Sequence, residues 1–450
     1  MRTTRKLVSI VLSLLFLLTF TSGALATSDS AETVHLYAWT NPANLEELIA
    51  QFNTDFAGQY NMVYEKMADA TTLTINTALS SGEPVNVMTQ ASAMDLRNRA
   101  DDDVYMGLTQ FFDQEGWTYE DVMGSAVAET MNINGEYYAI PYCNNINMVW
   151  FNKNMFDEAG VAYPEEGWTW EDFRQTAIKL TSGEGANKVY GAMIDICDGD
   201  GDNYWDTIAR QKLGAFTYYN EDYTATTFDT AEMLESLQFF YQMSMVDECV
   251  VPYADYMALQ YYKDSIGMAG LYNGKYAMWI APVYGCLYLK SSYGEIPEGT
   301  DIGLADMPTV EGGETVTTCY TSTASIPANT PDAQASWEAL KYLTLTHAEL
   351  FAGNKAMHPG YTLKTDEEKE AFNSIIFSNK PGLDYDMAMT VMARDRALVS
   401  KDNTISVGQV TINEAIRKYM TLVFTGEMTP EDALANIKDE GDAAIAAGLD

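Results

Sequence analysis

The chain has 450 residues, with 64 Asp and Glu against 26 Lys and Arg, which gives a formal net charge of −38 at pH 7. Such an acidic surface repels nucleic acid and anionic lipid headgroups, so neither is expected as a partner, and a neutral ligand is favoured over an anionic one. Hydrophobic residues make up 47% of the chain, as in globular proteins, and the length suffices for two or three domains.

Residues 1–26 have the pattern of a signal peptide. A basic start is followed by an apolar run over 7–20 and by the small residues Ala24 and Ala26 of a cleavage site. The run is shorter than the roughly 20 residues that a membrane-spanning helix needs. No Cys near the cleavage site offers a point of lipid attachment. We therefore expect an exported protein that is soluble after cleavage, in a periplasm or outside the cell.

Short strand patterns alternate with helical ones from here on, which predicts an α/β protein. The first strand is expected over 34–39. A helix should start at Asn44 with Glu47 as its capping-box partner, and a second strand should cover 85–88, after a helix that ends at 80–82.

Two later helix starts have strong local signals. Thr169 and Asp172 form a capping-box pair at the first of them. At the second, Thr429 precedes Pro430, which suits the first position of a helix expected over 431–449.

The cysteines are widely spaced and form no CxxC pair, which argues against a zinc site and against redox chemistry. We expect buried side chains with at most one disulfide, and the odd count leaves one thiol unpaired within a monomer. The five are Cys143, Cys197, Cys249, Cys286 and Cys319.

Four ordered segments span most of the chain after the signal peptide. They are VHLYAWT at 34–40, SGEPVNV at 81–87, NGEYYAIP at 134–141 with VWFNKNMF at 149–156, and NGKYAM at 273–278 with DIGLADMP at 301–308. Together they resemble the extracellular solute-binding proteins of sugar-importing ABC transporters, the broad family that includes maltose-binding protein. The second match is partial, because the Asp of the family's Gly-x-x-Pro-Asp-Val stretch is missing and only Asn86 stands close by.

The resemblance implies a two-lobe, periplasmic-binding-protein-like fold with a hinge and a ligand cleft between the lobes. The lobes would be 32–143 plus 320–372 and 144–319 plus 373–450. It also implies the function: a binding component that captures a neutral mono- or oligosaccharide and delivers it to a membrane permease. We expect a monomer that uses no cofactor.

A neutral sugar needs aromatic platforms for its ring faces and amides or hydroxyls for its rim. Tyr284 stands where the family has a stacking Trp, and this difference leaves the substrate class open. Core packing is the alternative for any one of the aromatic residues. The candidate ligand-binding residues are Trp39, Thr40, Gln90, Tyr142, Asn144, Trp205, Tyr284 and Tyr320.

An acidic loop offers a weaker alternative, a calcium site at Asp198, Asp200 and Asp202. The EF-hand pattern wants Gly at its sixth position and Glu at its twelfth, but Asn203 and Ala209 stand there. We expect no bound metal.

A secreted glycoside hydrolase is the main alternative function. It would need a carboxylate pair across the scissile bond, and no motif singles one out among the many acidic residues. The only histidines are His35, His347 and His358, with no HExxH, and Gly-x-Ser-x-Gly is absent. A structural or adhesive surface protein would show repeats, and none is seen. The sequence therefore favours binding without catalysis.

Overall fold

The computed structural model describes the chain in ten ranges. They are 31–39, 45–68, 72–90, 96–196, 204–214, 217–290, 294–353, 356–361, 363–401 and 407–448. The predicted signal peptide, Thr40 and the three aspartates of the calcium hypothesis lie outside the described residues. Within these ranges no helix combines the length and the apolar character needed to cross a membrane.

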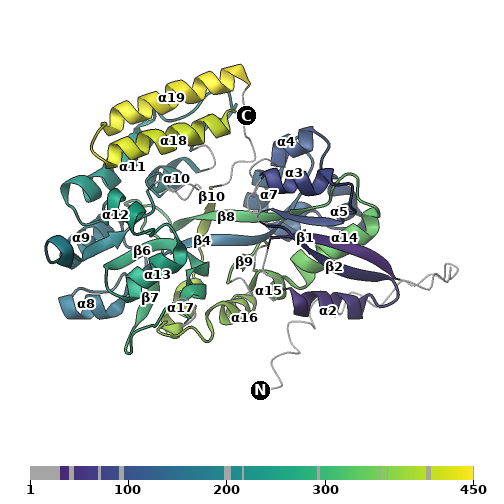
Figure 1. Cartoon of the computed structure of the whole chain (residues 1–450), viewed down its shortest axis with the longest axis horizontal. Helices are drawn as coiled ribbons and strands as arrows, with labels where there is room; N and C mark the ends of the chain where they lie inside the picture. Colours follow the sequence, from purple (N-terminus) through teal and green to yellow (C-terminus); the bar gives the residue numbers. More distant parts are fainter. Residues whose placement is uncertain are drawn as a thin grey trace.

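Strands and helices alternate along the chain, as the sequence predicts (Figure 1). The strands are β1 Glu32–Ala38, β2 Tyr60–Lys66, β3 Val87–Gln90, β4 Ile140–Asn152, β5 Tyr190–Met193, β6 Tyr276–Pro282, β7 Ile302–Ala305, β8 Val316–Ser325, β9 His358–Pro359 and β10 Ala397–Ser400. The α-helices are α2 Glu46–Asp55, α3 Thr72–Ser80, α4 Leu96–Asp101, α5 Thr109–Glu115, α6 Tyr119–Met123, α7 Ser125–Met131, α8 Lys153–Ala159, α9 Trp170–Leu180, α10 Thr207–Leu213, α11 Ala231–Tyr241, α12 Tyr253–Ala258, α13 Asp264–Tyr272, α14 Ala333–Lys341, α15 Ala348–Phe351, α16 Asp366–Phe377, α17 Tyr385–Met392, α18 Gln409–Phe424 and α19 Pro430–Ala447. The 3-10 helices are η3 Gly185–Asn187 and η6 Val283–Tyr288, and the π-helical turns are η5 Gln242–Val246 and η8 Tyr342–Thr346.

Hydrogen-bonded strands follow the order β2-β1-β3-β8-β4-β6-β5, with β10 beside β8 and with β7 and β9 beside β4. β1 is parallel to both β2 and β3, and β5 is parallel to β6. β4 and β8 are antiparallel to each other in the middle of this path. Parallel strands at both ends with helices around them make this a mixed α/β protein.

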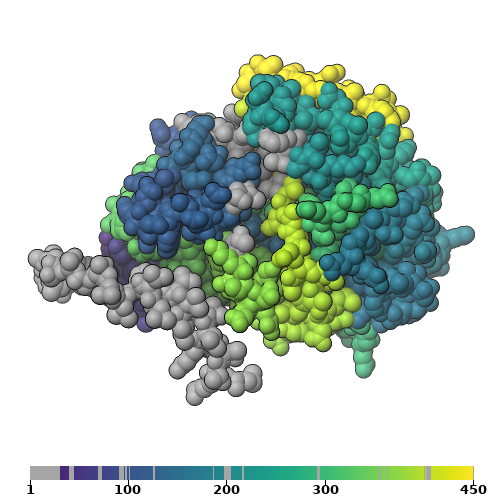
Figure 2. All heavy atoms as spheres, turned by 180° about the vertical axis from the view of Figure 1, so that it is seen from behind, coloured from purple at the N-terminus to yellow at the C-terminus, as the bar shows by residue number. Residues whose placement is uncertain are grey.

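Two bodies share the crossing strands β4 and β8. The first half of β4 pairs with β8, whereas its second half pairs with β6 and β7. β8 likewise pairs with β10 near its start and with β3 at its end. The bodies lie on either side of these strands in Figure 1 and form distinct blue and teal-to-green masses in Figure 2. The predicted two-lobe α/β fold is confirmed.

Two large hydrophobic cores fill the protein. The first includes residues of β1, α2, α5 and α14 and continues into α13 and α16. The second lies among α9, α10, α11, α18 and α19. β6 is buried on both faces, and its alternating side chains supply both cores: Trp279 and Ala281 pack in the first, Met278 and Ile280 in the second.

Local signals predicted two of the three helix starts. The third helix, α2, begins at Glu46 after Leu45 without a side-chain cap, and Asn44 lies outside the described residues. The Thr169–Asp172 capping box is present at α9, and Thr429 caps α19 with Pro430 in its first turn. The strand expected over 85–88 is instead Val87–Gln90. At Asn86 the side-chain Oδ1 accepts the backbone N–H of His35 at 2.8 Å, which replaces a ladder bond and delays the start of the strand.

The cysteines also behave as expected. Cys143, Cys249, Cys286 and Cys319 are buried, and burial raises the pKa of both Cys249 and Cys286 to about 12. Cys197 lies outside the described residues. Buried thiols with a high pKa are poor nucleophiles, so Cys249 and Cys286 act as small apolar side chains.

The buried imidazole of His358 in β9 gives a prediction for pH. Its Nε2 lies 2.8 Å from Oδ1 of Asn373. Burial lowers the pKa of His358 to about 4, with Arg396 adding to this and the Asn373 bond opposing it. The unfolded chain takes up this proton near pH 6.5, so the free energy of unfolding should fall as the pH drops from about 6.5 to 4, by up to about 3 kcal/mol.

Urea unfolding of wild type and His358→Gln at pH 7, 5.5 and 4 measures this contribution. The difference between the two proteins should shrink towards low pH, because the variant has no imidazole to protonate. A difference that stays constant over this range would contradict the prediction. His347→Gln, whose side chain is 25% exposed, is the matched control.

Candidate functional site

One face of the crossing strands carries a group of polar and aromatic side chains. Asn145 of β4 lies opposite Tyr320 of β8 in the antiparallel register. Two residues along, the Nδ2 of Asn147 donates to Oγ1 of Thr318 at 2.8 Å. β10 runs parallel to β8 and brings Lys401, directly after its end, beside Tyr320. Since alternate residues share a face of a strand, these side chains lie on the same side of the sheet.

Lys401 lies between two aromatic rings on this face. Its Nζ is 4.2 Å from the ring centroid of Tyr204 and 5.2 Å from that of Tyr320. The same ammonium donates to Oη of Tyr320 at 3.2 Å, and Lys401 is only 9% exposed. Tyr204 in turn donates from Oη to Oδ1 of Asn147 at 3.0 Å. Cation–π contacts and hydrogen bonds thus hold both rings in place.

Tyr142 and Trp39 lie next to each other in the first body. The pairing of β4 with β8 is irregular at Tyr142, whose ring is fully buried 4.5 Å from that of Phe351. Burial raises the pKa of Tyr142, and hydrogen bonds with Ser322 and Trp39 oppose the shift. Trp39 follows the last residue of β1 and is half-buried. The structure therefore brings these two predicted residues together.

Two predicted amide side chains bond within the protein. Gln90 is 2% exposed and donates to Oγ of Ser325 at 3.0 Å. Asn144 points to the face opposite Asn145. Its Oδ1 accepts from Oγ1 of Thr321 at 3.1 Å, and its Nδ2 donates to the carbonyl of Pro359 in β9 at 3.4 Å.

Trp205 and Asp206 precede α10 in the second body. The indole of Trp205 is fully buried in the second core, and its carbonyl accepts from Oγ of Ser236 at 2.6 Å. Oδ2 of the fully buried Asp206 accepts from Nε of Arg210 at 2.7 Å and from Oη of Tyr218 at 2.6 Å. Burial opposes the charge of Arg210, but Asp206 and Tyr218 outweigh it and raise its pKa. A stacking role for Trp205 stays a prediction.

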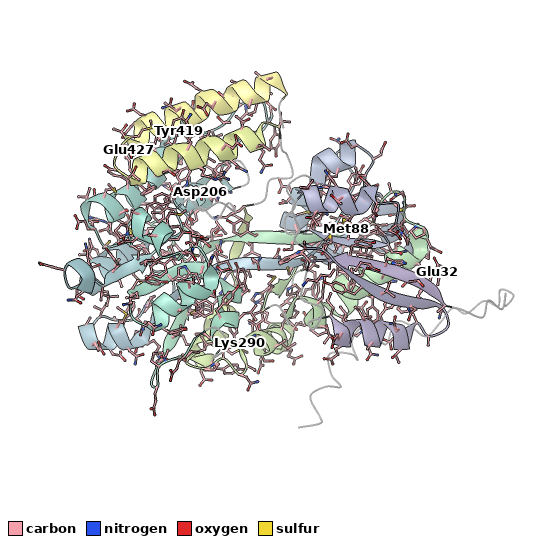
Figure 3. The ribbon with its side chains drawn as sticks, in the orientation of Figure 1. Glu32, Met88, Asp206, Lys290, Tyr419 and Glu427 are labelled. Carbon is pink, nitrogen blue, oxygen red and sulfur yellow. The ribbon has the colours of Figure 1, made fainter. Side chains whose placement is uncertain are left out.

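Figure 3 shows where Asp206 lies in the second body. Asp206 lies beside the gap above the crossing strands, and Met88 of β3 lies across that gap in the first body.

Tyr284 lies in a different part of the protein, in η6. It is half-buried against the first core and donates from Oη to Oδ2 of Asp264 at 2.9 Å. Its role in binding stays a prediction.

Sequence reasoning missed Lys401, Tyr204 and Asn147. One signal was available: adjacent asparagines in an apolar strand, at 144 and 145, must point to opposite faces, so one of them has to lie on a polar face. Lys401 had no such signal, because its neighbours depend on the pairing of β10 with β8.

Across the described ranges, no group of three or more His, Cys, Asp and Glu side chains is arranged to hold a metal ion. The calcium hypothesis concerns residues outside these ranges and stays a prediction.

Comparison with known proteins gives a family match and several similar structures. A family model described as bacterial extracellular solute-binding protein matches residues 39–349. An ABC substrate-binding protein from Listeria monocytogenes, in complex with cycloalternan, is similar with a TM-score of 0.71 and 18% identity over 94% of this chain and 100% of that chain. A sugar transporter protein from Rhizobium etli, in an open conformation, is similar with a TM-score of 0.73 and 17% identity over 92% and 100%.

The GacH receptor of Streptomyces glaucescens, studied with acarbose, is similar with a TM-score of 0.67 and 17% identity over 93% of this chain and 99% of that chain. At these identities the likeness shows a shared fold. No curated protein gives a sequence match.

Proposed function

Because the chain belongs to the family of bacterial extracellular solute-binding proteins, we propose that it is the substrate-binding component of a sugar ABC importer. It captures a neutral mono- or oligosaccharide between its lobes and delivers it to a membrane permease. Members of this family bind solutes without transforming them, so the protein is not an enzyme. The family match therefore favours this reading over a secreted glycoside hydrolase.

The observation that supports a sugar as the ligand is the polar and aromatic face of the crossing strands. It offers the half-buried ring of Tyr320, the amide of Asn145 and the ammonium of Lys401 within one cluster. Aromatic faces with amide and ammonium donors around them suit a ring whose edge is lined with hydroxyls. The solved proteins of the same fold were studied with cycloalternan and with acarbose, which supports a saccharide here.

We propose that one lobe consists of residues 32–143 and 320–372 and the other of residues 144–319 and 373–450. α16 contacts β9 through Asn373 and also packs against η6, which supports a third crossing of the chain near this helix. Ligand binding would close the lobes only as far as the contacts made in the closed state exceed those in the open state.

The proposal also covers the export of the protein and its partners. The signal peptide at 1–26 is removed on export, and the mature protein acts as a monomer without a lipid anchor. The absence of Cys near the cleavage site supports the lack of a lipid anchor. The strongly negative surface supports a partner with basic docking loops on the permease.

Thermal unfolding with a panel of neutral sugars tests the function. A sugar at one hundred times its Kd should stabilise the protein by about 2.7 kcal/mol and raise Tm by several degrees. Tyr320→Ala should weaken binding about tenfold, because it removes the ring that lies beside Lys401. Leu73→Ala, at a side chain 77% exposed on α3, is the control and should leave Tm and affinity unchanged.

One result would overturn the function, and another would overturn only the site. One is the absence of any shift with the panel while the purified protein hydrolyses a glycoside. The other is an unchanged affinity of Tyr320→Ala for a sugar that shifts the wild type, which would reject the site but keep the function.

A further inference from the structure

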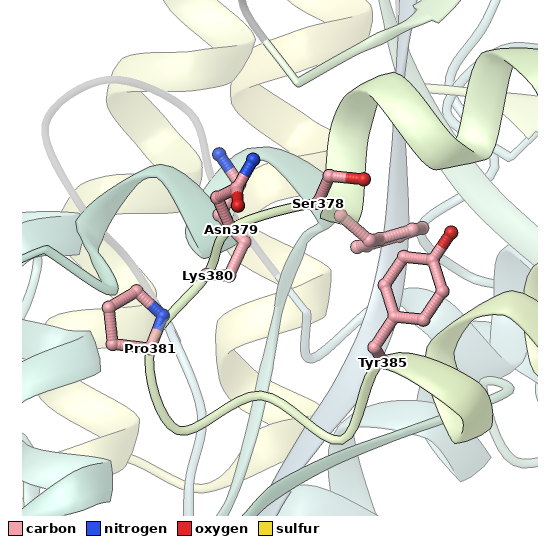
Figure 4. Close-up of a pocket in the computed structure, with 6 residues that line it drawn as sticks. Ser378, Asn379, Lys380, Pro381 and Tyr385 are labelled. Atoms are coloured by element: carbon pink, nitrogen blue, oxygen red, sulfur yellow. The ribbon is translucent and has the colours of Figure 1, made fainter. Parts of the chain in front are cut away.

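A hollow of about 610 Å³ lies on the surface inside the loop that joins α16 to α17 (Figure 4). The hollow is shallow and open to solvent, so a ligand would be covered on one side only. The hollow lies between α16 and α17, at the lower edge of the molecule in Figure 1, and none of its lining residues belongs to the proposed sugar site on β4, β8 and the end of β10. The hollow is therefore separate from the proposed cleft. It is lined by Phe377, Ser378, Asn379, Lys380, Pro381 and Tyr385.

The loop around the hollow is held in a fixed shape. Ile302 of β7 donates its N–H to the carbonyl of Gly382 at 2.7 Å, and its own carbonyl accepts from the N–H of Asp384 at 2.9 Å. Asp384 also caps α17 through Met387 and accepts from Nζ of Lys153 at 2.6 Å. The left-handed backbone at Gly382 (φ 74°) completes the turn. The backbone next to the hollow is therefore in place before a ligand binds, and the entropy cost of binding falls on the side chains.

Four side chains around the hollow have polar groups that can bind a ligand. Within the described part of the chain, Ser378, Asn379, Lys380 and Tyr385 form no side-chain hydrogen bond or ion pair. They supply a hydroxyl, an amide, an ammonium and a phenol, all of which can donate to or accept from ligand hydroxyls. Figure 4 shows that they come from one loop and from the first residue of α17.

An aromatic platform stands beside these groups. Tyr385 is 39% exposed and is the one aromatic residue among the large hydrophobic side chains that are well exposed in the described ranges. Phe377, which is only 1% exposed, also lines the hollow. A ring presented to solvent, with hydrogen-bonding groups around it, suits the apolar face of a sugar.

The charges near the hollow favour a neutral ligand. Asp384 is paired with Lys153, and Asp386 is exposed next to Tyr385. Lys380 adds one positive charge, but the protein as a whole carries −38 and repels anions. We propose that the hollow is a second saccharide site, which takes one pyranose unit of a neutral glycan with its face on Tyr385 and its hydroxyls bonded by residues 378–380.

Affinity electrophoresis tests the site. Native gels would contain soluble starch, hydroxyethyl cellulose or xylan as the neutral polysaccharide. At least one should retard the wild type, and Tyr385→Ala should raise the Kd for that polysaccharide at least fivefold. Tyr385→Phe keeps the ring and should keep most of the retardation. Val246→Ala, at a side chain 60% exposed in η5, is the matched surface control.

A comparison with the cleft variant separates the two sites. Tyr320→Ala should stay retarded in the gel while it loses its thermal shift with small sugars, and Tyr385→Ala should behave in the opposite way. Unretarded wild type in all three gels, or equal retardation of wild type and Tyr385→Ala, would overturn the second site. So would loss of retardation in Tyr320→Ala, because the cleft would then hold the glycan. Equal Tm values for the variants exclude misfolding as the cause.

Discussion

Replacing Trp205 with alanine should lower the free energy of unfolding by about 3–5 kcal/mol. The indole is fully buried in the second core, so its removal leaves a large cavity that the surrounding side chains cannot fill without strain. Urea unfolding of the purified variant measures the loss. The same residue was predicted from the sequence to contact ligand, and its burial makes the stability effect the larger expectation.

A half-buried tryptophan provides the matched control for this experiment. Trp117 lies against the first core, 6.4 Å from the ring of Phe112, and Trp117→Ala should cost clearly less than Trp205→Ala. If Trp205→Ala unfolds like wild type but binds sugar more weakly, the indole contacts ligand in solution and the packing interpretation is wrong.

Asp306→Asn should cost about 3–5 kcal/mol as well. Asp306, which is 2% exposed, accepts from Nη1 of Arg394 at 2.7 Å and from Nη2 of Arg396 at 2.9 Å. Burial lowers the pKa of Arg396, and Asp306 opposes that shift. Without the carboxylate, two guanidinium groups face each other with no neutralising charge between them.

The same arginine offers an exposed partner for the control. Glu166, 69% exposed, lies 3.3 Å from Nε of Arg394, and Glu166→Gln should change stability by less than about 0.5 kcal/mol. Urea unfolding of both variants at one pH gives the comparison. An Asp306→Asn protein no less stable than Glu166→Gln would show that the buried pair is not needed for folding.

Local signals predicted much of the fold, and long-range contacts explain where they failed. The caps at Thr169 and Thr429 depend on residues within one helical turn, so the sequence displays them directly. The start of β3 depends on Asn86 and His35, which are 51 positions apart. No window of sequence shows such a contact, so the strand was predicted two residues too early.

The candidate site was predictable by residue type but not by placement. Tyr142 and Trp39 were chosen as aromatic residues at loop positions beside polar ones; Tyr142 instead lies inside β4, and the structure brings the two together. Lys401 and Tyr204 were missed because their contact requires β10 to lie beside β8 and the segment before α10 to fold over both. Periodicity gives the face of a strand, whereas the neighbouring strand comes from the topology.

The placement of β8 between β3 and β4 has a consequence for how the chain is made. β3 ends at Gln90 and the first half of β4 is complete by residue 146, but their shared partner is synthesised only by Ser325. At roughly 5–20 residues per second, the two earlier strands wait on the order of ten seconds or more with open edges. Unpaired edges invite wrong partners, so a nascent chain of this protein needs shielding until its last crossing strand emerges.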